Sequence, residues 1–190
     1  MHYCVHVFTK TFPSMADLED IMKPFNEEDY YNDESLERPD ILWDYWVLGG
    51  RYGGKLHLKY DPEDKTSPYE WAYLKFNKPR NGRLFHCSLL YEMLENSMDK
   101  YSKYEEKYFC YMKGDNYIHV DGAKISDLVN VNDMKCYCYI DTDGKAHTRD
   151  HFDYDTLKII ENKNFDAEYK EYLKKCELDG SYVTVLDIHD

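Results

Sequence analysis

The chain lacks any long apolar run and any sequence feature of export. No stretch of its 190 residues reaches the roughly 18 consecutive apolar residues that a membrane-spanning helix requires. The N-terminal stretch, MHYCVHVFTK, has neither the basic start nor the long apolar centre of a secretion signal. These absences predict a soluble, cytoplasmic protein that makes no contact with a membrane.

Positive charge is also scarce. The sequence has 24 lysine and arginine residues against 37 aspartate and glutamate residues, a formal net charge of −13. A surface of that sign repels the phosphate backbone, so we expect no direct binding of nucleic acid. The small basic segment KPRNGR, residues 78–83, is interpreted as a solvated turn. The acidity favours a basic protein partner, although solubility alone also explains it.

Familiar catalytic and cofactor motifs are missing as well. The sequence contains no G-x-S-x-G nucleophile elbow, no P-loop and no G-x-G-x-x-G turn. The six cysteines are scattered, so reduced and mostly buried thiols are expected. One set of side chains has zinc-binding chemistry, although core packing of a strand explains its cysteines equally well. That set is Cys136, Cys138, His147 and His151. No cofactor and no metal is predicted.

The sequence that is present mixes strand and helix patterns, with no linker and no internal repeat. It predicts a single α+β domain over residues 1–190, with a mostly antiparallel sheet and helices packed on one side. Residues 26–40 are dominated by acidic side chains and predict a surface loop. Strands are expected at 2–9, 55–60, 134–140, 145–149 and 181–190, and either a strand or a short helix at 69–76. Helices are expected after Ser14, over 88–107 and at 165–176.

The segment WDYWVLGGRYGG, residues 43–54, combines four aromatic side chains with four glycines and an arginine. Glycine permits positive φ angles, arginine binds carboxylate or phosphate, and aromatic rings stack on bases. This combination suits an anionic, ring-bearing ligand such as a nucleotide, or the centre of a protein interface. The structural alternative is that the tryptophans pack under the sheet, the glycines form a turn, and Arg51 pairs with Asp44 or a core carboxylate.

Candidate site residues follow from this segment and from the last strand. We predict that Arg51 lies within reach of Asp187 or His189, because an acid in an apolar strand needs a partner. If the chain is a hydrolase or phosphodiesterase, His6, Asp187 and His189 are its acid–base candidates, since terminal strands often lie centrally in small sheets. The candidates for binding a ligand or partner are Trp43, Asp44, Trp46, Gly49, Gly50, Arg51, Tyr52 and His189.

Residues 43–52 resemble the signature W-D-W-Y-x-x-G-G-R-[WF] of a family of small proteins encoded by bacteriophages and prophages. The resemblance extends to HYCVHVFTKTFPSMADLEDIMKPFNE, YIHVDGAKISDLVN, YCYIDTDGKAH and VTVLDIHD, and it covers about two thirds of the chain. The chain departs from the family pattern mildly: Tyr45 and Trp46 are in reversed order, Tyr52 replaces Trp or Phe, and Leu186 replaces Val. The family's recurrent residues correspond to Trp43, Asp44, Gly49, Gly50, Arg51, Asp121, Gly122, Asp187 and His189.

The resemblance implies a setting, namely viral DNA inside an infected or lysogenic bacterial host. Accessory phage proteins of this size often counter host defence, so we expect a counter-defence protein that acts by binding. Its target would be a basic, nucleic-acid-handling immune effector such as a CRISPR nuclease complex, attracted by the acidic surface. An alternative is sequestration of a nucleotide immune signal in a pocket of Trp43, Trp46, Arg51 and His189. Hydrolysis of that signal is a further alternative.

Overall fold

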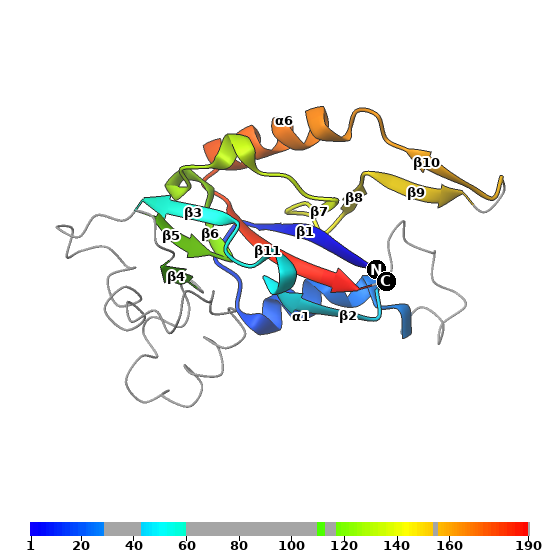
Figure 1. Ribbon diagram of the computed structural model, residues 1–190, viewed down its shortest axis with the longest axis horizontal. Helices are drawn as coiled ribbons and strands as arrows, with labels where there is room; N and C mark the ends of the chain where they lie inside the picture. The colour runs from blue at the N-terminus through cyan, green and yellow to red at the C-terminus, as the bar shows by residue number, and fades with distance from the viewer. Residues whose placement is uncertain (29–42, 60–109, 113–116, 154–155, 190) are drawn as a thin grey trace.

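A computed structural model describes residues 1–28, 43–59, 110–112, 117–153 and 156–189 (Figure 1). The described elements form an α+β fold around a mainly antiparallel sheet with the strand order β2-β11-β1-β7-β8, and β6 also pairs with β11. Several predicted segments lie outside the described residues. They are most of the acidic 26–40 loop, the strand or short helix expected at 69–76, the basic segment 78–83 and the expected helix 88–107. The strands of this sheet are β1 (His2–Thr9), β2 (Tyr45–Leu48), β6 (Gly122–Lys124), β7 (Cys138–Ile140), β8 (Ala146–Thr148) and β11 (Tyr182–His189).

The two terminal strands lie side by side at the centre of the sheet. β1 and β11 are antiparallel over their full length, from His2 opposite His189 to Thr9 opposite Tyr182. β7 runs parallel to β1, whereas β2 and β6 run antiparallel to β11. The predicted hairpin around DTDG is confirmed, because β7 and β8 pair across it. The central position of β11 brings both chain ends to one end of the sheet (Figure 1).

The helix α1 (Met15–Met22) begins where the sequence predicts. The Ser14 side chain accepts the Asp17 N–H, and the Asp17 carboxylate accepts the Ser14 N–H, which completes the expected capping box. Pro24 lies in the short 3-10 helix η1 (Lys23–Phe25) that follows. The buried side chains Leu18 and Met22 pack against one face of the sheet.

The helix α6 (Phe165–Leu178) covers the other face, so the expectation that helices pack on one side of the sheet is wrong in that detail. The cause is visible in β1, whose alternate residues are apolar on both faces. Val5 belongs to the core cluster under α1, whereas Cys4 and Phe8 belong to the cluster under α6. A strand with two apolar faces is stable only when both faces are covered.

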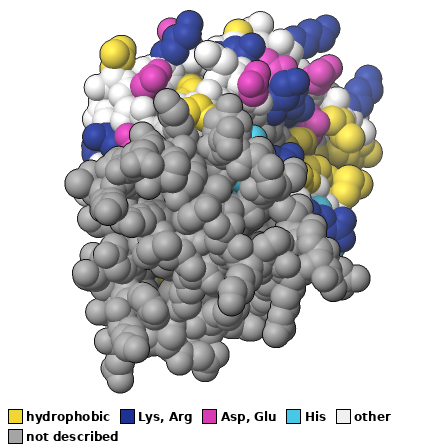
Figure 2. All heavy atoms as spheres, turned by 60° about the vertical axis from the view of Figure 1, so that its left-hand side comes forward, with side chains coloured by type: hydrophobic (Ala, Val, Ile, Leu, Met, Phe, Trp, Pro, Cys, Tyr) yellow, Lys and Arg dark blue, Asp and Glu magenta, His cyan; other side chains and the backbone are white. Residues whose placement is uncertain are grey.

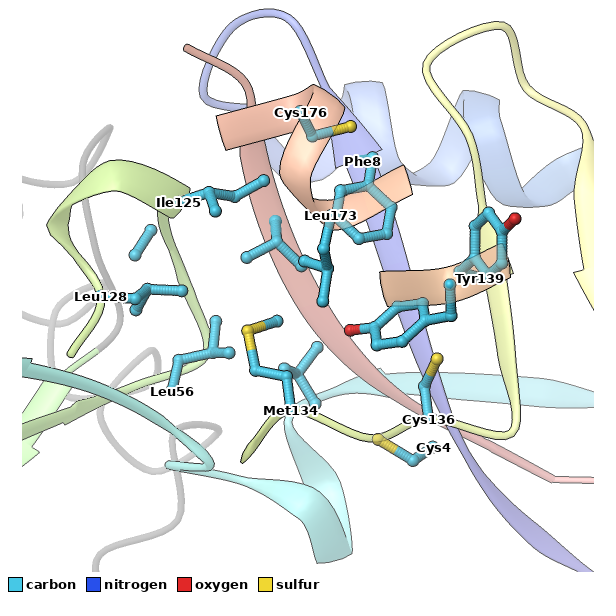
Figure 3. Close-up of a cluster of buried hydrophobic side chains, with 14 of the residues drawn as sticks. Cys4, Phe8, Leu56, Ile125, Leu128, Met134, Cys136, Tyr139, Leu173 and Cys176 are labelled. Atoms are coloured by element: carbon cyan, nitrogen blue, oxygen red, sulfur yellow. The ribbon is translucent and has the colours of Figure 1, made fainter. Parts of the chain in front are cut away.

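The cluster under α6 is the larger core of the described molecule. Figure 3 shows Phe8 of β1 beside Leu173 and Cys176 of α6. The Phe8 and Tyr139 rings meet edge-on, with centroids 6.0 Å apart. The four described cysteines are buried and form no disulfide with one another, which agrees with the expectation of mostly buried thiols. These four are Cys4, Cys136, Cys138 and Cys176.

Two smaller sheets complete the described fold. One has the order β3-β5-β4, and the other consists of β9 and β10. Short 3-10 helices connect the strands, and no described helix is long and apolar enough to cross a membrane. The remaining elements are β3 (Leu56–Lys59), β4 (Cys110–Met112), β5 (Tyr117–Val120), β9 (Asp150–Asp153), β10 (Lys158–Glu161), η2 (Gly50–Tyr52), η3 (Ile125–Asp127) and η4 (Val131–Asp133).

Candidate functional site

The segment 43–54 leaves β2 at the edge of the sheet and turns back over β11. Gly49, Gly50 and Gly54 have φ angles of 66°, 51° and 70°, which residues with a side chain rarely adopt. A Cβ atom on Gly49 would lie 2.2 Å from Asp121 Oδ2, and one on Gly50 would lie 2.3 Å from the Asp187 Cβ. These glycines therefore serve a close approach of the loop backbone to two acidic side chains.

Those two acidic side chains, Asp121 and Asp187, hold the loop in place. Both are buried, with 0% and 2% of the residue exposed. Asp121 Oδ1 accepts the Gly54 N–H at 2.6 Å, and Asp187 Oδ2 accepts the Arg51 N–H at 2.8 Å. A buried carboxylate requires such donors, and the loop supplies them from its backbone. Three segments far apart in the sequence, around 49–54, 121–122 and 187–189, therefore meet at one place.

The predicted proximity of Arg51 and Asp187 is confirmed, but the bonding atoms differ from the expectation. The Arg51 backbone N–H makes the hydrogen bond, whereas the Arg51 side chain is exposed. The Asp187 carboxylate also lies against His2, with 2.9 Å between Asp187 Oδ1 and His2 Nδ1. The buried acid is therefore satisfied without a guanidinium.

A row of three rings crosses the end of the central strands. The strand register places His189 opposite both His2 of β1 and Tyr45 of β2. The His2 and His189 ring centroids are 5.0 Å apart, and the Tyr45 ring is stacked on His189 at 4.9 Å with an interplanar angle of 8°. Directly opposed residues share one face of a sheet, so the three rings form one surface.

Each histidine of this row has a carboxylate partner. His2 Nδ1 is bonded to Asp187, and His189 Nδ1 lies 3.0 Å from each carboxylate oxygen of Asp44. A carboxylate only accepts, so Nδ1 carries the hydrogen in both pairs, and Nε2 is the nitrogen that remains for a ligand. Desolvation raises the pKa of Asp44, but hydrogen bonds from His189 and from the backbone outweigh it and hold that pKa below its usual value.

Two cationic residues lie at Tyr52, which contacts the backbone of His2. The Tyr52 hydroxyl donates to the His2 backbone oxygen at 2.9 Å, and Lys55 Nζ lies 4.8 Å from the centroid of the Tyr52 ring. Arg51 directly precedes this tyrosine and is exposed. Two positive charges therefore lie beside a tyrosine that contacts the backbone of His2, in a protein that is acidic overall. We define the histidine site as Asp44, Tyr45, Arg51, Lys55, Asp187 and the two histidines, His2 and His189.

The two tryptophans expected at the site lie on the opposite face of the sheet. Trp43 is 1% exposed and its ring is 5.0 Å from that of Phe25. Trp46 is partly buried against the same cluster under α1. Alternate residues of a strand point to opposite faces, so Tyr45 and not Trp46 faces the histidines. For the tryptophans the structural alternative is correct, and the expected pocket of Trp43, Trp46, Arg51 and His189 is wrong.

The hydrolase alternative would require His6 to lie near His189, and the structure does not bring them together. His6 pairs with Val185, four residues before His189, which separates them by about 13 Å along the strand at ~3.3 Å per residue. His6 is 2% exposed and its Nδ1 lies 2.5 Å from the Tyr169 hydroxyl. Burial, followed by the charge of Lys55, lowers the pKa of His6 to about 3. The histidine that meets His189 is therefore His2.

The buried His6 predicts a loss of stability in acid. The unfolded chain binds one more proton than the folded protein between the usual histidine pKa of 6.5 and the lowered pKa of about 3. The contribution of the neutral His6 to the free energy of unfolding is complete above pH 6.5. It decreases as the pH is lowered, and the loss is about 2 kcal/mol at pH 5. In urea unfolding, His6→Gln should lose correspondingly less stability between pH 7 and pH 5. Equal losses in both proteins would contradict the assignment.

The four residues considered as a zinc set do not converge. Cys138 packs under α1 and Cys136 packs under α6, so both cysteines are core residues that lie on opposite faces of the sheet. His147 Nε2 lies 2.9 Å from Asp141 Oδ2, and its ring stacks on Tyr139 with centroids 4.5 Å apart. Within the part of the chain that the structure describes, no group of three or more His, Cys, Asp or Glu residues is arranged to hold a metal.

His2 and Tyr45 were not among the residues predicted for the site. Both could be found by pairing the two terminal strands antiparallel and end to end, since this register places His2 opposite His189. The alternation of β2 then assigns Tyr45 to the same face and the tryptophans to the other. The missed signal is thus one of register and not of composition.

No family model matches the chain, and neither a curated protein nor a solved structure matches it. The histidine site therefore rests on the geometry of the chain's own residues.

Proposed function

We propose that this chain is a phage or prophage binding protein that captures a small anionic ligand bearing a flat ring, of the nucleotide class, at the histidine site. The observation that carries the proposal is the row of Tyr45, His189 and His2 at the end of the central strands, with Arg51 and Lys55 beside Tyr52, which contacts the backbone of His2. In a bacterial host, capture of a nucleotide immune signal would counter the defence that depends on it.

The chemistry of the row matches the two parts of such a ligand. Tyr45 is 47% exposed and presents aromatic surface for a base. Imidazole and guanidinium N–H groups donate the hydrogen bonds that phosphate oxygens accept. The nearby Asp187 does not oppose an anion strongly, because its carboxylate is buried and already accepts from the Arg51 N–H.

Capture is better supported than hydrolysis. Cys4 is the residue of β1 opposite Asp187, and so the thiol closest to the histidines along that strand. Burial raises its pKa to about 12, so the thiol is not ionised at neutral pH. The site's clearest feature is a set of donors and an aromatic surface, which binds without requiring turnover.

Thermal-shift screening and calorimetry with cyclic and linear nucleotides test the proposal, with inorganic phosphate and uncharged nucleosides as reference ligands. A nucleotide at 100 times its Kd should stabilise the protein by about 2.7 kcal/mol. His189→Gln and Arg51→Ala should each weaken binding at least about tenfold, since each removes a donor to a charged phosphate, a hydrogen bond worth about 1.5 kcal/mol or more.

The chain offers a matched control in His147. Like His189, it bonds an aspartate and stacks on a tyrosine, but it lies on β8. His147→Gln should leave nucleotide binding unchanged. Absence of any nucleotide-dependent shift, or equal losses in the His147 and His189 variants, would overturn the proposal.

Inhibition of a basic immune effector, such as a CRISPR nuclease complex, remains a second proposal that rests on the net charge of −13. The surface at α6 does not add to it, because acidic and basic side chains are interspersed over the upper part of the molecule in Figure 2. The acidic residues at 61–64 lie outside the described residues, as does most of the 26–40 loop.

A further inference from the structure

The hairpin of β9 and β10, which we call the arm, extends away from the central sheet (Figure 1). All four residues of β10 are exposed. Ile159 lies directly opposite Phe152 in the register, and the two are 72% and 43% exposed. Leu157 and Ile160 add further exposed apolar surface, at 73% and 43%. Exposed apolar side chains gathered on one short hairpin in this way are typical of an interaction site.

The base of the arm is fixed to the body of the protein. The Tyr137 hydroxyl donates to Asp150, and the Asn162 N–H donates to the Arg149 oxygen at 2.8 Å. The Arg149 guanidinium in turn binds the Asp166 carboxylate of α6 and lies 5.0 Å from the Phe165 ring centroid. The apolar residues are therefore held outward by specific contacts at the root of the arm.

The arm also presents an open strand edge. β10 pairs with β9 and with no other described strand. The outer edge of such a strand carries backbone N–H and C=O groups that an extended peptide can pair with. When a peptide adds to an edge in this way, backbone hydrogen bonds supply affinity and alternate side chains supply specificity.

Charge determines which partner fits this edge. The described arm carries Asp150, Asp153 and Glu161 against Lys158, and the whole chain has a net charge of −13. A second copy would bring the same negative charge to the contact, which opposes self-association. A segment in which Lys or Arg alternates with apolar residues complements both the acids and the exposed apolar pair.

We infer that the arm docks an extended segment of a partner protein, with alternating basic and apolar residues, as an added strand along the outer edge of β10. This inference is independent of ligand capture at the histidine site. It assigns protein binding to a surface that the segment 43–54 does not reach by any described contact.

Synthetic nine-residue peptides of alternating Lys and Val or Phe are suitable probes, measured by fluorescence anisotropy at low and moderate salt. Equally basic peptides with Ser in place of the apolar residues are the reference. The alternating peptides should bind at least tenfold tighter and should slow amide exchange in residues 158–161 of the unmodified protein. Phe152→Ser/Ile159→Ser keeps the net charge and should remove this preference, whereas Leu178→Ser, at an 88% exposed leucine, should retain it.

Three results would overturn the inference: equal binding of both peptide sets, a preference that survives Phe152→Ser/Ile159→Ser, or a dimer of the chain that this double variant dissociates. Nucleotide binding should be unchanged in the double variant. A failure at the arm is therefore distinguishable from a failure at the histidine site.

Discussion

Replacing Gly49 with alanine is expected to destabilise the protein by about 4 kcal/mol. The φ angle of 66° costs a side-chain-bearing residue about 1 to 2 kcal/mol. The new Cβ would lie 2.2 Å from the buried Asp121 carboxylate, and such overpacking typically costs a further 1 to 3 kcal/mol, about the remainder of the expected loss. Urea unfolding monitored by circular dichroism measures the difference.

Gly144 provides the matched control for this substitution. Its φ angle is 82°, but a Cβ atom placed there would meet nothing within 4 Å. Gly144→Ala should therefore show the backbone cost alone, about 1 kcal/mol. If the two substitutions destabilise the protein equally, the close approach of the loop to Asp121 is not what requires glycine at position 49.

Replacing Asp187 with alanine is expected to cost about 3 kcal/mol, because it removes the acceptor of two hydrogen bonds that involve a charged group. The Arg51 N–H and His2 Nδ1 would both lose their partner in a region where the aspartate side chain is 3% exposed. Arg51→Ala should change stability by less than about 0.5 kcal/mol, since its backbone N–H is retained and its side chain is on the surface.

The two substitutions distinguish structure from ligand binding at the same contact. The Arg51→Ala variant should unfold at the same urea concentration as the parent protein but bind nucleotide more weakly. A large loss of stability in Arg51→Ala, with little effect of Asp187→Ala, would show that the guanidinium and not the backbone holds the loop. Chemical denaturation of both variants, in parallel with the parent protein, gives the result.

Elements with strong local signals were predictable from the sequence. The capping box of Ser14 and Asp17 determines where α1 begins. The spacing of Phe165, Tyr169 and Leu173 specifies the buried face of α6. These signals are local because each depends on residues within one or two helical turns, so no tertiary information is needed.

Features that depend on long-range contacts were predicted less well. The apolar residues on both faces of β1 indicate that both faces of the sheet are covered. Which helix covers which face depends on the path of the chain between the strands and the helices, and no local sequence pattern specifies that path. The hairpin of β9 and β10 was not predicted from the sequence. Residues 150–161 mix acidic and apolar side chains without clean alternation, and the arm packs on little that would impose such a pattern.

The candidate site was likewise predicted in part. The meeting of Arg51 with Asp187 followed from the chemistry of a buried acid, but the bonding atom depends on loop φ angles that the sequence does not specify. The choice of Tyr45 over Trp43 and Trp46 depends on which face of β2 is turned toward the histidines. A shift of the β2 register by one residue would turn Trp46, in place of Tyr45, toward the histidines.

The central claim is that His2 and His189 together form a binding site for a nucleotide-class ligand. Its most direct test is a nucleotide titration of protein labelled with ¹⁵N-histidine, followed through the imidazole nitrogen signals. We predict that the Nε2 signals of His2 and His189 shift together and saturate at one ligand concentration, while those of His6 and His147 stay unchanged. Signals of His2 and His189 that no nucleotide moves, or shifts confined to the other histidines, would contradict the account.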